Sequence, residues 1–295
     1  MKLAIVGYGN LGKSLEREIK QDNELTLTAI YSRRNLDNEL YRPLKQIEQD
    51  GDFDVALLAL GSFNDIMEYA HLFNCIDTVD SFDTHAKIDE YRDLLNITKK
   101  HNLSVISTGW DPGLLSLARG VFSIGASKTA TLWGEGVSQG HSNAIRQIRG
   151  VLDAVQFTRP KENALELIGQ GVTDGTRLHE RICYVAAVEQ DLERVEKEIV
   201  TMPNYFKDYD TKVIFCSRQE IRELKARTAH RGQVVCLGND FEACVSLTMD
   251  SNTDYTAKIM LAYAKALPRL KADGYRGAVD VFDIPLKYLA KRQFI

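Results

Sequence analysis

A glycine-rich turn near the N-terminus constrains the fold more than any other feature of this sequence. Residues 3–6 form a short apolar run that leads directly into Gly7-Tyr8-Gly9-Asn10-Leu11-Gly12, the pattern G-x-G-x-x-G. Apolar residues then recur at helical spacing over 11–19. A strand that passes through such a turn into a helix is the context of the dinucleotide-binding fingerprint. We therefore predict a βαβ unit that binds a dinucleotide; the alternative is a plain strand-to-helix turn.

The glycines of this motif have separable tasks. Gly7 allows the tight turn, Gly9 lets the backbone approach a pyrophosphate, and Gly12 lets helix and strand pack closely. Amide groups at the start of the helix face the anion and are aided by the helix dipole. Asn10 and Leu11 complete the loop, and we assign all five residues to cofactor binding.

The end of the second expected strand, residues 25–31, distinguishes between the two nicotinamide cofactors. A carboxylate there would hold the ribose 2′-hydroxyl of NAD and repel a 2′-phosphate. This sequence instead has Ser32, Arg33 and Arg34. Guanidinium groups grip a phosphate dianion bidentately, so the pattern predicts NADP. The alternative is a solvated arginine pair on a loop.

Further along the chain, segments typical of strands alternate with segments typical of helices. Apolar strands are expected at 55–60, 78–80 and 103–107, and helices at 66–73 and 88–100. This alternation implies βαβ units with right-handed crossovers, and hence a doubly wound parallel sheet.

The residues that close the strand at 55–60 are Gly61 and Ser62. Ligands of open α/β sheets lie at the carboxyl ends of the strands, so we assign both residues to the cofactor. A simple turn is the alternative.

This alternation of expected strands and helices ends after about residue 109. Strands are expected at 151–158 and 181–188, a charged surface helix at 192–200, and a last long helix at 255–270. A second domain of the α+β class, inserted before the last helix, fits this order.

Composition excludes several classes of function. The 37 basic and 41 acidic residues leave a net charge of −4, and no Lys/Arg block suggests nucleic-acid binding. No apolar run approaches the roughly 20 residues of a membrane span, and the N-terminus does not resemble a signal peptide. Five cysteines without a CxxC argue against a disulfide framework or a zinc site. We expect a cytoplasmic protein with reduced thiols, and no metal.

Several longer segments make the sequence recognisable. They are Thr78–Asp83 (TVDSFD), Ser107–Gly113 (STGWDPG), Ser138–Ser142 (SQGHS), Thr201–Phe206 (TMPNYF) and Asn252–Ala257 (NTDYTA). With the N-terminal motif, they make the chain resemble the meso-diaminopimelate D-dehydrogenases over nearly its whole length. STGWDPG and SQGHS are the most specific.

The resemblance implies an NADP-dependent, reversible oxidative deamination at the D-centre of meso-2,6-diaminopimelate. The products are ammonia and L-2-amino-6-oxopimelate, whose cyclic form is tetrahydrodipicolinate, in lysine and cell-wall precursor synthesis. It also implies a homodimer whose last long helix returns to the first domain. We therefore predict a Rossmann-type dinucleotide-binding domain formed by residues 1–110 and 252–295. Residues 111–251 are the inserted α+β domain for substrate binding and dimerisation.

Two carboxylates are candidates for the chemistry at the reacting amine. Asp80 and Asp111 lie at expected strand ends, where a carboxylate can hold the amine or imine and move protons to and from water. Turn or helix-cap roles are the alternative, because Asp111 precedes Pro112 and Gly113. The resemblance favours the catalytic role without identifying the base. Asp83 is assigned to the cofactor.

Residues that match family positions for the substrate lie in the inserted domain and beside it. They are Trp110, Trp133, Gln139, Gly140, Thr158, Arg181, His230 and Asn252. Arg181 and Thr158 are assigned to the distal L-carboxylate, and backbone amides of Gln139 and Gly140 to a carboxylate. The alternatives are core packing for the tryptophans, a flexible loop for Gln139 and Gly140, a surface ion pair for Arg181 and a helix N-cap for Asn252.

The neighbourhood of His230 departs from the family pattern. The family has approximately His-Gly-Gly-His there, whereas this chain has His230-Arg231-Gly232-Gln233. Two other functions stay open on sequence grounds: an NADP-dependent reductase of a different oxo acid, and a non-catalytic NADP(H)-sensing protein.

Overall fold

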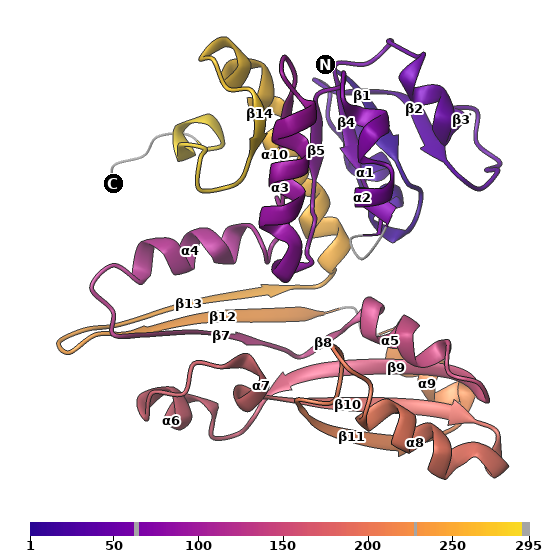
Figure 1. Ribbon diagram of the computed structural model, residues 1–295, viewed down its shortest axis with the longest axis vertical. Helices are drawn as coiled ribbons and strands as arrows, with labels where there is room; N and C mark the ends of the chain where they lie inside the picture. Colours follow the sequence, from indigo (N-terminus) through magenta and orange to yellow (C-terminus); the bar gives the residue numbers. More distant parts are fainter. Residues whose placement is uncertain (62–64, 227–228, 291–295) are drawn as a thin grey trace. The chain divides into compact units, whose positions relative to one another are not determined.

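The computed structural model describes residues 1–61, 65–226 and 229–290 (Figure 1). The chain divides into two compact units, one formed by residues 1–117 and 253–295 and the other by residues 118–252. The boundaries expected from sequence follow residues 110 and 251. Among the described residues, no helix has the length and apolar character needed to cross a membrane.

The first unit is built on a parallel sheet. Its strands in the described residues are β1 (Lys2–Val6), β2 (Thr26–Ser32), β3 (Tyr41–Pro43), β4 (Val55–Leu58), β5 (Thr78–Asp80), β6 (Leu103–Val105) and β14 (Gly277–Val279). The spatial order is β14-β6-β5-β4-β1-β2-β3, and every pairing is parallel. This is the doubly wound order, with β14 added at one edge. The Rossmann-type prediction is therefore confirmed.

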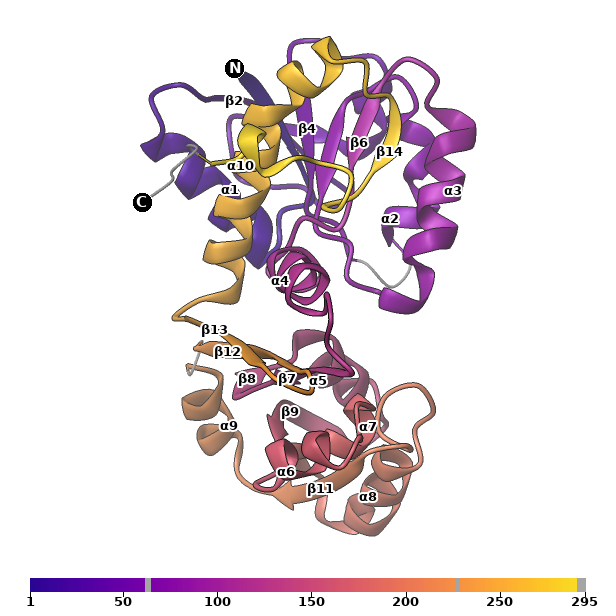
Figure 2. The same cartoon turned by 90° about the vertical axis from the view of Figure 1, so that its left-hand side faces the viewer.

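Helices cover both faces of this sheet (Figures 1 and 2). One face is covered by α1 (Asn10–Gln21) and α10 (Asn252–Ala272), and the other by α2 (Asp65–Glu68) and α3 (Ile88–Thr98). The central strand β4 sends alternate side chains into the two layers, which is why its sequence is apolar throughout. The helix expected at 66–73 is instead two short pieces, α2 and a 3-10 turn at Ala70–Phe73.

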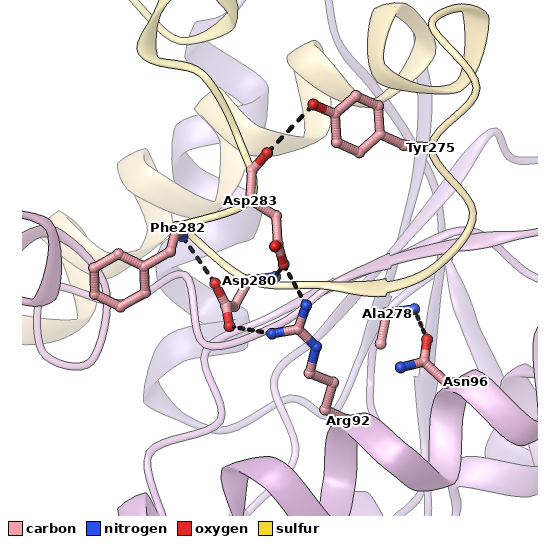
Figure 3. A network of polar contacts seen from close by, with 7 residues as sticks. All are labelled: Arg92, Asn96, Tyr275, Ala278, Asp280, Phe282 and Asp283. Carbon is pink, nitrogen blue, oxygen red and sulfur yellow. Dashed lines mark hydrogen bonds and ion pairs between the residues drawn. The ribbon is translucent and has the colours of Figure 1, made fainter.

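Polar contacts with α3 hold the C-terminal strand β14 and the residues that follow it. Arg92 on α3 binds Asp280 through Nη1 at 2.7 Å and Asp283 through Nη2 at 2.6 Å (Figure 3). One turn further along α3, Asn96 accepts a hydrogen bond from the Ala278 amide at 2.7 Å. These contacts help to fix a three-residue strand that the sequence did not predict.

The second unit contains two sheets in its described residues. The larger has the order β11-β10-β9-β8 and the smaller β13-β12-β7. Their strands are β7 (Lys128–Trp133), β8 (Gly136–Val137), β9 (Val151–Pro160), β10 (His179–Ala187), β11 (Asp210–Phe215), β12 (His230–Leu237) and β13 (Glu242–Met249). Helices complete the unit: most of α4 (Leu114–Phe122), α5 (Gln139–Arg146), α6 (Ala164–Gly169), α7 (Gly175–Leu178), α8 (Leu192–Val200) and α9 (Arg218–Lys225).

Apolar clusters hold these helices against the sheets. Ile145 of α5 and Val195 of α8 pack with Cys183 and Phe206 on one face of the larger sheet, whereas Ile221 of α9 packs on its other face. The expected strands and the charged helix at 192–200 are present. The hairpin of β12 and β13 was not expected.

Candidate functional site

The glycine-rich turn joins β1 to α1 as the motif predicts. The Gly7 amide donates a hydrogen bond to the Tyr31 carbonyl at 2.8 Å, and Gly7 has a φ of +94°. A side chain on Gly12 would overlap the Gly7 carbonyl oxygen, whereas one on Gly9 would meet no protein atom within 4 Å. Gly7 and Gly12 are therefore required by the protein's own packing. The open side of Gly9 lies at the start of α1, where a dinucleotide phosphate can approach the backbone.

The residues that follow β2 carry the expected charges. The Ser32 hydroxyl accepts a hydrogen bond from the Arg34 amide at 3.1 Å, and Arg34 Nη2 donates to the Tyr8 carbonyl at 3.4 Å. Arg33 forms a bidentate ion pair with Asp65, with distances of 3.0 and 2.6 Å. Arg34 is therefore held beside the glycine-rich turn and Arg33 beside the start of α2, and these residues fit the 2′-phosphate of NADP.

Two further predicted cofactor residues follow β4. Gly61 lies near its carboxyl end and packs against Asp65, whose Oδ2 would be 3.3 Å from a Cβ on Gly61. Ser62 lies outside the described residues.

The Asp80 side chain is wholly buried at the end of β5. One carboxylate oxygen accepts hydrogen bonds from the amides of Phe82 and Ser107, both at 2.9 Å, and the other accepts one from the Tyr91 hydroxyl at 3.0 Å. Burial raises the pKa of Asp80 to about 6, against the opposing effect of these hydrogen bonds. The predicted catalytic role does not fit this geometry, because a wholly buried carboxylate whose two oxygens already accept hydrogen bonds cannot reach a substrate amine. Asp80 instead ties together the segments after β5 and β6.

Those two segments carry the other predicted residues of the first unit. Asp83 is exposed in the segment after β5, and Trp110 and Asp111 are half-buried in the segment after β6. The segments touch, since a Cβ on Gly109 would lie 3.8 Å from that of Ser81. Asp83 and Asp111 therefore lie on neighbouring segments at the carboxyl edge of the sheet.

In the second unit, Arg181 and Thr158 are paired directly across β10 and β9. Directly opposed residues of an antiparallel pair project to the same face, so their side chains are neighbours. Gln156, two residues before Thr158, is fully buried and donates to the Thr158 hydroxyl at 3.1 Å. The structure thus brings together two residues that are 23 positions apart in the chain.

Arg181 is buried without a carboxylate partner among the described residues. Its Nε and Nη1 have no hydrogen-bond partner in that part of the chain, and the Oε1 of Gln156 is unpartnered there too. The guanidinium lies 3.5 Å from the ring centroid of Tyr209 and 5.6 Å from that of Phe206. Burial lowers the pKa of Arg181, as expected for a cation removed from water. A surface ion pair, the alternative for Arg181, does not fit this environment.

His141 lies in the same region and was not among the predicted residues. Its ring packs on Tyr205 and Phe206, with centroid distances of 5.3 and 5.7 Å. Burial and, to a smaller extent, the charge of Arg181 together lower the pKa of His141 to about 3. A neutral ring therefore lies near the guanidinium. The position of His141 in the segment SQGHS is the only sequence signal that could have identified it. No sequence signal points to Tyr209.

Trp133 and His230 are held by other parts of the second unit. The Trp133 amide donates to His179 Nε2 at 2.8 Å, and the two rings lie 5.1 Å apart. His230 contacts Gly136, which is paired with Thr158, and its Nε2 lies 3.1 Å from the Val137 carbonyl oxygen. Pairing across β8, β9 and β10 therefore connects His230 to the neighbourhood of Arg181.

Two predicted substrate positions lie at helix N-termini. Gln139 and Gly140 begin α5, where the Ser138 hydroxyl caps the His141 amide, so they are not in a flexible loop. Asn252 is the first residue of α10.

Comparisons with known proteins decide the family. The model of the diaminopimelic acid dehydrogenase C-terminal domain matches residues 109–251. The meso-diaminopimelate D-dehydrogenase of Acetivibrio thermocellus is 41% identical, and the alignment covers 99% of this chain and 95% of that protein. The chain belongs to the meso-diaminopimelate D-dehydrogenase family. The Corynebacterium glutamicum member is 38% identical over 96% of this chain and 93% of its own.

Solved structures agree with this membership. The diaminopimelate dehydrogenase of C. glutamicum, in complex with diaminopimelate, has a TM-score of 0.90 at 36% identity, covering 99% of this chain and 96% of that one. An engineered D-amino acid dehydrogenase bound to NADP+ has a TM-score of 0.87 at 35% identity, covering 99% and 97%. The predicted family is confirmed, and these similarities extend over both units.

Proposed function

We propose that this protein is an NADP-dependent meso-diaminopimelate dehydrogenase. It oxidises the D-centre of meso-2,6-diaminopimelate, with water, to L-2-amino-6-oxopimelate and ammonia, and catalyses the reverse reaction. NADP supplies the hydride acceptor. The lone pair of the amine forms the imine as hydride leaves carbon; water then adds to the imine, and ammonia departs. Family membership, the glycine-rich turn and the arginines after β2 support the cofactor and the reaction.

The observation that carries the substrate assignment is the buried guanidinium of Arg181. A cation held out of water without an acidic partner is unfavourable unless a ligand supplies the negative charge. A carboxylate satisfies Nε and Nη1 together, because the guanidinium fork matches its two oxygens. Thr158 adds a hydroxyl beside it. We therefore assign Arg181 and Thr158 to the L-carboxylate of the substrate.

We assign Asp111 and Asp83 to the reacting D-centre. They lie on adjoining segments at the carboxyl edge of the sheet, where an open α/β sheet places its cofactor. A carboxylate near the amine can orient it and accept the proton released when water adds to the imine. Asp83, which the sequence analysis assigned to the cofactor, thereby takes the role that it suggested for Asp80. Trp110, Trp133, Gln139, Gly140, His230 and Asn252 are proposed to line the rest of the substrate site.

Stereochemistry gives the decisive experiment. NADPH formation is followed with meso-, LL- and DD-diaminopimelate. We expect oxidation of the meso isomer and none of the LL isomer, which has no D-centre. Oxidation of the LL isomer at a similar rate would show that the two ends are not distinguished. Absence of turnover with every isomer, despite tight NADP+ binding, would instead favour an NADP(H)-sensing protein.

The first unit is proposed to bind the dinucleotide, and the second to bind substrate and to form a homodimer. Exposed apolar side chains in the second unit support association: Val121 is 57% exposed and Ile124 78%. Light scattering that returns the monomer mass of 33.2 kDa at all concentrations would contradict a dimer. All five cysteines, each within the described residues, are unpaired, which supports a cytoplasmic location.

A further inference from the structure

We propose that Asp65 positions Arg33 for the 2′-phosphate of NADP and so takes part in cofactor selection. The inference rests on the proposed NADP-dependent function. No sequence motif points to Asp65, which lies 32 residues from Arg33 in the chain. Folding brings them together because each follows a strand of the same sheet.

The ion pair lies on the cofactor side of that sheet. Arg33 directly follows β2, and Asp65 begins α2 after β4. The strand order places β1 between β4 and β2, so the pair connects the segments on either side of the glycine-rich turn. Two strand spacings separate β2 from β4 by roughly 10 Å, and the side chains of Arg33 and Asp65 together span this distance.

The guanidinium of Arg33 is oriented from two directions. Asp65 accepts one N–H from Nη1 and one from Nη2, at 3.0 and 2.6 Å. The ring of Tyr69, whose centroid is 5.6 Å from the guanidinium carbon, lies against it as well. Together these contacts fix the plane of a side chain that is half exposed to solvent.

This arrangement leaves donors for a second anion. A guanidinium has five N–H groups; the pair with Asp65 uses two of them and the hydrogen bond with the Tyr69 side chain uses one more, so two are left for a phosphate. Asp65 and a 2′-phosphate can therefore bind Arg33 at the same time, through different N–H groups. Because Asp65 already orders the Arg33 side chain, binding of the phosphate does not bear the entropy cost of ordering it.

The position of Asp65 is itself determined by the backbone near the cofactor. The Ile66 amide donates to the Gly61 carbonyl at 3.2 Å, and Asp65 Oδ2 would be 3.3 Å from a Cβ on Gly61. The absence of a side chain at Gly61 therefore lets the carboxylate lie close to the strand end.

The test measures binding, without any amino acid substrate. Dissociation constants of NADP+ and NAD+ are determined by calorimetry for the wild type, Asp65→Asn and Asp65→Ala. We expect NADP+ binding to weaken about two- to tenfold, the factor for ordering one long side chain, and NAD+ binding to stay within about twofold. In an Arg33→Ala background, Asp65→Ala should weaken NADP+ binding no further. Asp52→Asn is the matched control, because Asp52 pairs with Lys2 in the same unit.

Three outcomes would overturn the inference. Tighter NADP+ binding in Asp65→Asn would mean that Asp65 repels the phosphate or competes with it. Equal weakening of NADP+ and NAD+ would mean that Asp65 only supports α2. A loss that persists in the Arg33→Ala background would mean that it does not act through Arg33. Wild-type protein that prefers NADP+ but oxidises no isomer of diaminopimelate would overturn the proposed reaction alone.

Discussion

Replacing Arg181 with methionine should make the substrate-free protein more stable while removing most of its activity. Arg181 is 6% exposed, and its guanidinium has no acidic partner among the described residues. Removing such a cation from water costs several kcal/mol. The interaction with the Tyr209 ring offsets up to about 2 kcal/mol of this cost. Methionine fills similar space without a charge, so we expect Arg181→Met to gain about 1–2 kcal/mol in unfolding free energy.

The same change should harm catalysis with the two-ended substrate. Each hydrogen bond to a charged group is worth about 1.5–3 kcal/mol, so losing a bidentate pair should lower kcat/KM for meso-diaminopimelate about a hundredfold or more. Turnover should fall along with affinity, because the remote end aligns the reacting carbon. A D-amino acid without a distal carboxylate should be affected much less, provided the enzyme accepts it.

Urea unfolding without substrate and steady-state kinetics test both halves of this prediction. Arg159→Met is the matched control, since Arg159 is an ion-paired arginine on β9 that is 42% exposed. It should change stability by no more than about 1 kcal/mol and leave kinetics unaltered. The reasoning fails if Arg181→Met destabilises the fold and leaves kcat/KM for the meso isomer unchanged. Arg181 would then be a structural residue.

Two further predictions concern the first unit. Gly9→Ala should fold with an unchanged melting temperature but bind NADP+ at least about tenfold more weakly, because its methyl group meets no protein atom and blocks only the phosphate. Gly12→Ala should instead destabilise the fold by about 1–3 kcal/mol. Calorimetry and thermal unfolding of both variants test this, and a destabilised Gly9→Ala beside an unaffected Gly12→Ala would contradict it. Asp80 has a folded-state pKa of about 6, above its ordinary 3.8, so its contribution to stability is present at low pH and is lost as pH rises through 6. Unfolding free energy should therefore fall by about 2 kcal/mol more in the wild type than in Asp80→Asn between about pH 4 and pH 7, and the same pH dependence of urea unfolding in the two proteins would contradict this.

Features that depend on neighbouring residues in the chain could be predicted from the sequence. The strand, the glycine-rich turn and the helix that follow one another from Lys2 to Gln21 carry their own signals, since each is specified by side chains a few positions apart. The arginines after β2 predict the cofactor for the same reason. Segments such as STGWDPG and SQGHS identified the family, and with it Arg181 and Thr158.

Tertiary structure decided the features that depend on burial and on distant partners. Asp80 and Asp83 are both acidic residues of one short segment, and only the packing of Ser107 and Tyr91 shows that Asp80 is sealed while Asp83 is exposed. The strands β3 and β14 were not expected from the sequence, and they exist because a sheet edge pairs with them. Asp65 contacts Arg33 because the fold places β2 and β4, the strands that these residues follow, on the two sides of β1. A side chain's environment depends on the whole fold, so no local pattern could have revealed these roles.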